Sequence, residues 1–120
     1  MPEHPLHRFF SSQRPRPTFE WERYQQRDVL IIDHPRCQAV FSRQGAQLLH
    51  FQPAGERPWL WCAEQWPQVG AIRGGVPVCW PWYGCHPSED LWPDHGWARL
   101  LDWKLVDSRE DEEGVTLKWR

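Results

Sequence analysis

The amino-acid sequence predicts an all-β fold, and three observations support that prediction. Apolar, β-branched runs are short and are bounded by charged residues, as strands of a small sheet often are. Turn signals separate these runs at intervals of roughly 8–12 residues, a spacing typical of sandwiches and barrels. The chain of 120 residues contains 12 prolines. Because proline removes a backbone donor and clashes inside a helix, long helices are disfavoured.

Five segments are expected to be strands. Residues 29–33 form a β-branched run flanked by charge, and residues 37–42 and 46–51 follow it after short turns. Residues 101–106 and 115–119 are two later apolar runs. No segment shows a convincing helical period over three turns, so a meander of short strands is the expected organisation.

Three further segments carry weaker signals. Residues 18–24 alternate weakly, residues 59–61 resemble a short strand, and the acidic residues 107–114 predict a solvated turn. The sequence ends at Arg120, directly after a strand pattern, and an uncovered strand edge favours association. We therefore expect residues 18–120 to be the N-terminal portion of a truncated β-sandwich domain, which could self-associate through this edge.

The beginning of the chain has a different composition. Residues 1–17 are rich in Pro, Arg and Ser and predict a flexible, extended leader. Arg8, Arg14 and Arg16 make this leader locally basic, but the formal net charge of the chain is −2. A nucleic-acid partner is therefore not expected. Because neither a membrane-spanning run nor a signal-peptide core is present, we expect a cytoplasmic protein without a membrane partner.

The cysteines give a weak metal signal. The sequence offers four candidate ligands for a zinc site, Cys79, Cys85, His86 and His95, but their spacing matches no standard zinc knuckle or zinc ribbon. Scattered cysteines in a cytosolic chain are more often small buried hydrophobes. We therefore expect neither a metal nor another cofactor.

Residues 70–99 have the composition of a shaped, ordered loop. Glycines and prolines make regular secondary structure sparse there, while tryptophans and a tyrosine argue against disorder. Aromatic faces suit the C–H faces of sugars, but they also suit bases and proline-rich segments. The composition therefore predicts a binding surface that forms one wall of a cleft, without choosing its ligand.

Three residues of this loop are candidate ligand contacts. Arg73 precedes two glycines and can offer a planar fork to hydroxyls or to a phosphate, although it could instead pair with a carboxylate. His95 precedes another glycine, and Arg99 follows four residues later. We expect the two parts of the loop to meet, so that Arg73, His95 and Arg99 lie near one another and form a cluster suited to a phosphorylated sugar.

The same motifs carry a family resemblance. Residues 72–84 read IRGGVPVCWPWYG, residues 93–99 read PDHGWAR, and Trp103 follows. Together they resemble the hexose-6-phosphate mutarotases, the glucose-6-phosphate 1-epimerase branch of the aldose 1-epimerase superfamily. The similarity runs from about residue 29 to residue 119. It implies part of a galactose-mutarotase-like β-supersandwich and cofactor-free interconversion of the α and β anomers of a hexose 6-phosphate.

The resemblance also implies roles for individual residues. Arg73 and Arg99 match the family's phosphosugar contacts, and His95 matches a histidine that lines the same pocket. The family's catalytic histidine and glutamate lie beyond Arg120, so no catalytic residue is expected in this chain. The acidic residues of 107–114 match neither catalytic group.

Three hypotheses follow from this incomplete match. The chain is the N-terminal part of a mutarotase, or a truncated homologue or pseudoenzyme that binds a phosphosugar without catalysis, or a fragment that folds only with its missing half. General acid–base catalysis needs both groups positioned around the sugar. For that reason we expect the 120-residue chain alone to be inactive.

Overall fold

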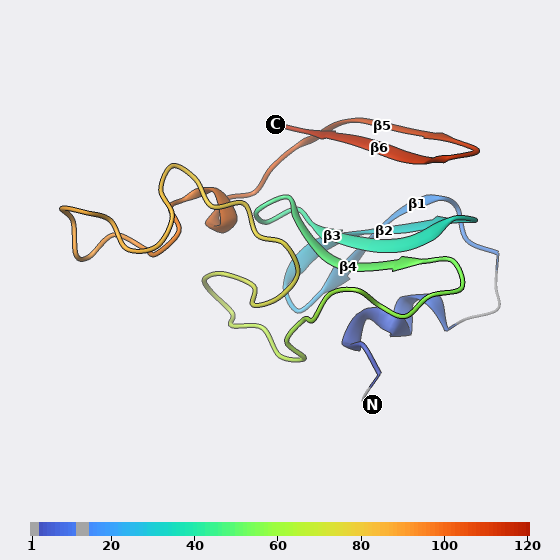
Figure 1. The fold of residues 1–120 in the computed structure, drawn as a ribbon, viewed down its shortest axis with the longest axis horizontal. Coiled ribbons are helices and arrows are strands. Elements are labelled where there is room, and N and C mark those ends of the chain that lie inside the picture. Colours follow the sequence, from blue (N-terminus) through green and yellow to red (C-terminus); the bar gives the residue numbers. More distant parts are fainter. Residues whose placement is uncertain (1–2, 12–14) are drawn as a thin grey trace.

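The computed structural model describes residues 3–11 and 15–120, and its main part is a small antiparallel β-sandwich (Figure 1). A four-stranded sheet in the order β1-β2-β3-β4 lies between a two-stranded hairpin and a short 3-10 helix, η1. The elements are η1 (Pro5–Phe10), β1 (Phe19–Tyr24), β2 (Arg27–His34), β3 (Cys37–Ser42), β4 (Gln47–Pro53), η2 (Ala98–Leu100), β5 (Leu105–Asp111) and β6 (Gly114–Trp119). The all-β prediction is confirmed.

Strand β2 is the centre of the sandwich because it is buried on both faces. Val29 and Ile31 point into one apolar cluster and are fully buried. Leu30 and Ile32 point into a second cluster on the opposite face and are equally buried. A strand covered on both faces needs apolar residues at successive positions, which explains the unbroken Val-Leu-Ile-Ile run.

Each face of the sheet has its own covering element. The helix η1 contributes Leu6 and Phe9 to the first cluster, together with Trp66 from a later loop. The hairpin of β5 and β6 covers the second cluster through alternate side chains, namely Leu105, Val115, Leu117 and Trp119. The period of two in these strands explains why the outward positions between them can be polar.

The hairpin is fastened to the sheet at its tip. The backbone N–H of Arg36 donates to Nδ1 of His34 over 3.0 Å, so the neutral ring carries its proton on Nε2. That Nε2–H then donates to the carbonyl oxygen of Asp111 over 2.7 Å. The hydroxyl of Thr18 donates to the carboxylate of Glu110 over 2.6 Å.

The predicted turn over residues 107–114 is wrong for most of its length, because β5 continues to Asp111. The turn itself is closed by Asp111, whose Oδ1 accepts the N–H groups of Glu113 and Gly114 over 2.8 and 3.1 Å. The acidic side chains stay exposed while the backbone pairs, so like charges do not prevent a strand. The predicted strand over 101–106 likewise begins only at Leu105.

Two other weak signals have opposite outcomes. The weakly alternating residues 18–24 contain β1, which pairs with β2 along its whole length. The predicted strand over residues 59–61 is wrong: this segment is a loop, and Cys62 forms only an isolated bridge with Gly74. The loop follows β4 closely enough for the N–H of Trp59 to donate to Phe51.

The prediction of an extended leader over residues 1–17 is wrong for residues 5–10, which form η1. Leu6 is 0% exposed and Phe9 is 6% exposed, so burial against the sheet outweighs the polar composition of this segment. Arg16 pairs with Glu20 over 2.8 Å. Residues 1–2 and 12–14, and with them Arg14, lie outside the described residues.

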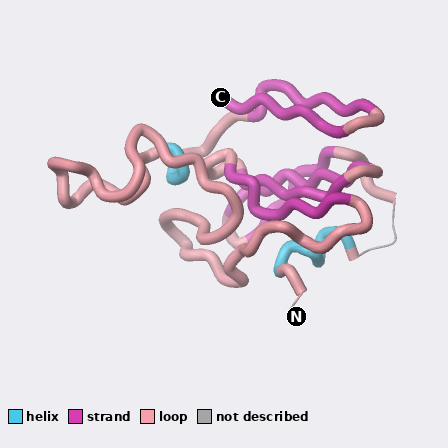
Figure 2. The backbone as a smooth tube through the Cα atoms, viewed as in Figure 1, coloured by secondary structure: helices cyan, strands magenta, loops and turns pink. Residues whose placement is uncertain are grey.

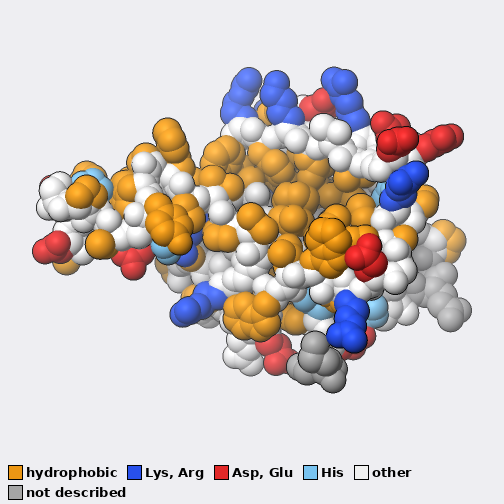
Figure 3. Space-filling model, viewed as in Figure 1, with side chains coloured by type: hydrophobic (Ala, Val, Ile, Leu, Met, Phe, Trp, Pro, Cys, Tyr) orange, Lys and Arg blue, Asp and Glu red, His pale blue; other side chains and the backbone are white. Residues whose placement is uncertain are grey.

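The outer edges of β5 and β6 have no partner strand in the described part of the chain. Hydrophobic side chains also gather between the hairpin and the sheet on the face shown in Figure 3. Self-association through an open edge therefore stays a prediction. In residues 3–11 and 15–120, no helix is both long and apolar enough to cross a membrane.

A pair of histidines, the half-buried His4 and the buried His50, lies where the N-terminal segment meets β4. The ring centroids of His4 and His50 are 4.3 Å apart. His50 is 0% exposed, and neither of its ring nitrogens has a hydrogen-bond partner among the described residues. Burial, together with the nearby His4 and His7, lowers the pKa of His50 to about 4. The folded chain therefore holds this ring neutral.

We expect acid to destabilise the chain through His50. The unfolded ring has a pKa near 6.5, whereas the folded ring has a pKa of about 4. The stability contributed by the neutral ring is thus fully present above about pH 6.5 and is lost as the pH falls towards 4. The loss is on the order of 3 kcal/mol, at about 1.4 kcal/mol per pKa unit.

Urea unfolding near pH 7 and near pH 4.5 tests this expectation. The His50→Phe variant keeps an aromatic ring but cannot take up a proton, so its free energy of unfolding should fall less with acid. Carboxylates titrate in both proteins and cancel in the comparison. Identical pH dependence in the two proteins would contradict the role of His50.

Candidate functional site

A pocket of about 620 Å³ opens within the long loop region, between residues 61–77 and residues 94–99. Arg73, His95 and Arg99 all line it. Residues 70–99 contribute to both of these segments, and Trp61 and Pro67 also line the pocket. Figure 2 shows that this region is almost entirely loop and extends to one side of the sandwich. The volume lies within the range typical of small-molecule pockets.

The backbone around Arg73 is held by a buried glutamine of β4. Nε2 of Gln47 donates to the carbonyl oxygens of Ile72 and Gly74 over 3.0 and 2.7 Å. The carbonyl of Arg73 itself accepts the N–H of Ala63 over 2.9 Å. The side chain of Arg73 is exposed and makes no hydrogen bond or ion pair with any residue that the structure describes. Its guanidinium is therefore available to a ligand.

Glycine is required at position 75 because the loop lies directly on β4. Gly75 has a φ of +62°, and a Cβ there would overlap the carbonyl oxygen of Leu48. The N–H of Gly75 donates to the carbonyl of Trp61 over 2.7 Å, and the N–H of Val76 donates to Leu48 over 2.8 Å. This close approach brings Arg73 to the edge of the sheet.

His95 is held by two hydrogen bonds to the same residue. Its backbone N–H donates to the carbonyl of Gly84 over 2.8 Å, and its Nδ1 accepts the N–H of Gly84 over 2.9 Å. The neutral ring therefore carries its proton on Nε2, where it can donate to a ligand. The next residue, Gly96, packs against the backbone of Trp80, where a Cβ would overlap the Trp80 carbonyl oxygen.

Arg99 is fixed by its own loop and by the turn between β3 and β4. Its Nη2 donates to the carbonyl of Asp94 over 2.9 Å, while its Nε is buried without a partner among the described residues. The Cα of Arg99 lies against Gly45, whose N–H donates to Leu101 over 2.7 Å. Arg99 is thus less free to move than Arg73.

A buried polar network joins the two walls of the pocket to the sheet. Nε2 of Gln44 donates to the carbonyl of Gly70 over 2.7 Å and to that of Arg99 over 3.3 Å. Arg27, the first residue of β2, donates to Gln44 over 3.2 Å and to Gly70 over 3.1 Å. Burial lowers the pKa of Arg27 from its ordinary value. These bonds set the distance between the walls.

The zinc site considered for Cys79, Cys85, His86 and His95 is not formed. Among the described residues, no group of three or more His, Cys, Asp or Glu side chains is arranged to hold a metal ion. Nδ1 of His95 is already bonded to Gly84. All four cysteines are free thiols; Cys62 is buried as expected, but Cys85 is exposed, contrary to the expectation for a small hydrophobe.

Among the other residues that line the pocket, one acidic and one aromatic residue are absent from the sequence-based prediction of ligand contacts. Asp94 supplies a carboxylate to the same wall as His95, and Trp61 supplies an indole to the opposite segment. The position of Asp94 directly before His95 was a usable signal. The sequence contains no comparable signal for Trp61, because residues 59–61 predict a short strand. Arg73 and Arg99 are permanently charged at neutral pH, so the pocket favours an anionic ligand.

The aldose 1-epimerase family model matches residues 28–120. The chain belongs to this family. The name of the family denotes epimerisation of an aldose at C1, which is the interconversion of sugar anomers. The motifs of residues 72–84 and 93–99 lie inside the matched range, and the resemblance inferred from them is confirmed.

Individual relatives agree with this assignment. Over 92 residues the chain is 49% identical to a protein of Escherichia coli (strain K12) provisionally named a glucose-6-phosphate 1-epimerase. A protein of Salmonella typhimurium with the same provisional name is 47% identical over 92 residues. In both cases the match covers 75% of this chain and 31% of the relative.

A crystal structure shows the same fold. It is that of a provisionally named mutarotase, YeaD, from Salmonella typhimurium, with a TM-score of 0.86 and 36% sequence identity. The match covers 97% of this chain and 41% of that chain. The chain thus has the mutarotase fold and spans less than half the length of these relatives.

Substitution of Gly75 should disrupt the pocket. Both Gly75 and Gly84 have positive φ, at +62° and +72°, so alanine at either position costs about 1–2 kcal/mol of backbone strain. Only at position 75 would the new Cβ meet backbone atoms. We expect Gly75→Ala to lower the free energy of unfolding by at least about 2 kcal/mol more than Gly84→Ala. Urea denaturation measures the difference, and equal losses would show that the loop does not lie on β4.

Proposed function

We propose that this chain binds a hexose 6-phosphate in the pocket of Arg73, His95 and Arg99. The main supporting observation is that two arginines line one pocket and that neither pairs with a carboxylate in the described chain. A phosphate dianion can accept charge-assisted hydrogen bonds from both guanidinium groups. Nε2–H of His95 is a further donor, suited to a sugar hydroxyl. The provisional names of the relatives agree with this ligand class.

We further propose that, within a longer polypeptide of this family, the site takes part in anomer interconversion. One group protonates the ring oxygen while another removes the proton of the anomeric hydroxyl. The C1–O bond of the ring then breaks to give the aldehyde, and closure after rotation gives the other anomer. By the family resemblance, the acid and the base are expected outside this sequence. We also propose a cytoplasmic location.

The rival proposal, a phosphosugar-binding module without catalysis, is favoured by one observation. Asp94 is the only carboxylate among the described residues that line the pocket, and it is adjacent in sequence to the only imidazole. The two arginines cannot exchange protons at neutral pH. The two proposals share the same ligand and differ only in whether a base and an acid join the site.

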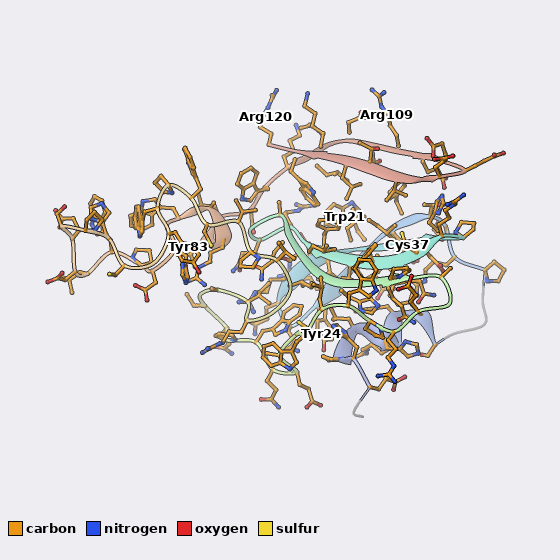
Figure 4. The ribbon with its side chains drawn as sticks, in the orientation of Figure 1. Trp21, Tyr24, Cys37, Tyr83, Arg109 and Arg120 are labelled. Atoms are coloured by element: carbon orange, nitrogen blue, oxygen red, sulfur yellow. The ribbon has the colours of Figure 1, made fainter. Side chains whose placement is uncertain are left out.

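Loss of Arg73 should weaken binding of glucose 6-phosphate by about 10- to 100-fold, the effect of removing a charge-assisted hydrogen bond. Isothermal titration calorimetry with glucose 6-phosphate, performed on Arg73→Gln and on the unaltered chain, measures this difference in affinity. The matched control is Arg109→Gln, because Arg109 is exposed, pairs with Asp107 over 2.7 Å and points away from the sheet (Figure 4). Equal affinities for the Arg73 variant and the unaltered chain would refute the proposed site.

The 120-residue chain alone should not accelerate anomer exchange of glucose 6-phosphate beyond the rate in buffer. A positioned acid or base typically contributes about 10²–10⁴-fold, and the pocket offers no pair of such groups on separate walls. Magnetisation-exchange NMR on the two anomeric protons gives the rate directly. Enhanced exchange that disappears in His95→Ala would overturn this prediction and make His95 the central catalyst.

A further inference from the structure

Two of the ten tryptophans have indoles without a partner in the described part of the chain. Trp61 and Trp80 make no side-chain hydrogen bond, ring contact or cation contact there, and they are 70% and 67% exposed. Each of the others makes at least one such contact: Trp21, Trp59, Trp66, Trp82, Trp92, Trp97, Trp103 and Trp119. Of the unpartnered pair, only Trp61 lines the pocket.

The backbone of Trp61 is fixed although its side chain is exposed. Its carbonyl accepts the N–H of Gly75 over 2.7 Å. The next residue, Cys62, is 3% exposed and forms a bridge with Gly74. These contacts place the indole next to the segment that carries Arg73. An indole anchored in this way loses little conformational freedom when a ligand covers it.

Exposure alone would mean little, because single apolar side chains are common on protein surfaces. The position of Trp61 is what distinguishes it. It adds the only large apolar face to a lining that otherwise presents two arginines, a histidine, an aspartate, glycines, prolines and small aliphatic groups. A pocket with a few convergent polar groups and one aromatic face matches a ligand that is anionic at one end and carries C–H groups at the other.

We propose that Trp61 is the platform on which the pyranose ring of the ligand stacks, while the arginines hold its phosphate. This inference rests on the proposed function and assigns the sugar ring and the phosphate to different residues of the pocket. The C–H face of the sugar covers the indole, and apolar area on both partners leaves water. Trp61 should therefore contribute to affinity for a hexose 6-phosphate but not for inorganic phosphate. Arg73 should contribute to both.

The test uses the 120-residue chain with three tryptophan substitutions, the Arg73→Gln variant described above, and two ligands. Trp61→Ala removes the platform, Trp61→Phe keeps an aromatic face, and Trp80→Ala removes an equally exposed, unpartnered indole outside the pocket. Affinities for glucose 6-phosphate and for inorganic phosphate are measured by NMR titration. Saturation-transfer difference spectra identify the sugar protons that contact the protein. Because neither indole packs against the core, thermal unfolding should be unchanged in all three variants.

We expect Trp61→Ala to weaken glucose 6-phosphate binding by tenfold or more, about 1.4 kcal/mol, and to leave inorganic phosphate binding unchanged. Trp61→Phe should retain most of the affinity, and Trp80→Ala all of it. Saturation transfer to the ring C–H protons should be strong in the unaltered chain and weak in Trp61→Ala. The indole Nε–H resonance that is missing in Trp61→Phe should shift when the sugar phosphate is added.

The outcomes separate this inference from the proposed function. If Arg73→Gln loses both ligands while Trp61→Ala binds glucose 6-phosphate normally, the platform is refuted and the phosphate site stands. If Trp61→Ala weakens both ligands equally, Trp61 shapes the pocket rather than stacking on the sugar, and the inference also fails. If the unaltered chain binds neither ligand, both the proposed function and the platform are overturned.

Discussion

Burial of β2 on both faces is the constraint on which the rest of this structure depends. Its four apolar residues fill two separate clusters, so one strand requires both η1 and the hairpin as covers. The polar residues at its ends are buried too, and each anchors a peripheral element. Arg27 bonds to the carbonyl of Gly70 in the pocket loop, and His34 bonds to Asp111 at the hairpin tip. A single strand thus positions the sandwich and the site together.

The pocket is held by side-chain amides where regular secondary structure is missing. An irregular loop still has to satisfy its backbone carbonyls. Gln47 does this for Ile72 and Gly74, and Gln44 does it for Gly70. Because both glutamines belong to the β3–β4 region, their hydrogen bonds tie the loop to the sheet and limit its movement. Glycine is also required at position 75, since a side chain there would force the loop away from Leu48.

The sequence was sufficient for elements whose pattern is local. The β-branched run of β2 and the two strands after it were predictable, because alternation and turn residues specify them. Burial of Leu6 was not predictable, since it depends on a sheet surface that forms only in the folded chain. The extension of β5 over the acidic residues to Asp111 was also missed, because a run of like charges favours a solvated turn, whereas backbone pairing with β6 and the bond of the Asp111 carbonyl to His34 hold a strand.

The site divides in a similar way. Arg73, His95 and Arg99 could be selected from their motifs and expected to lie together, whereas the side-chain bonds from Gln44 and Gln47 that hold their segments could not be predicted. Trp61 could not be separated from the other tryptophans by spacing. Its indole lacks a partner within the described chain and lines the pocket, and both are properties of the packed molecule. Sequence therefore identified the charged half of the pocket and missed its apolar half.

The hydrogen bond between His95 and Gly84 bears on what the site can do. Nδ1 of His95 accepts the N–H of Gly84, so the proton of the neutral ring lies on Nε2. That Nε2–H can donate a hydrogen bond to a sugar hydroxyl. Arg73 and Arg99 keep their protons at neutral pH. All three residues can thus donate hydrogen bonds to a ligand, which supports the proposed binding role of this pocket.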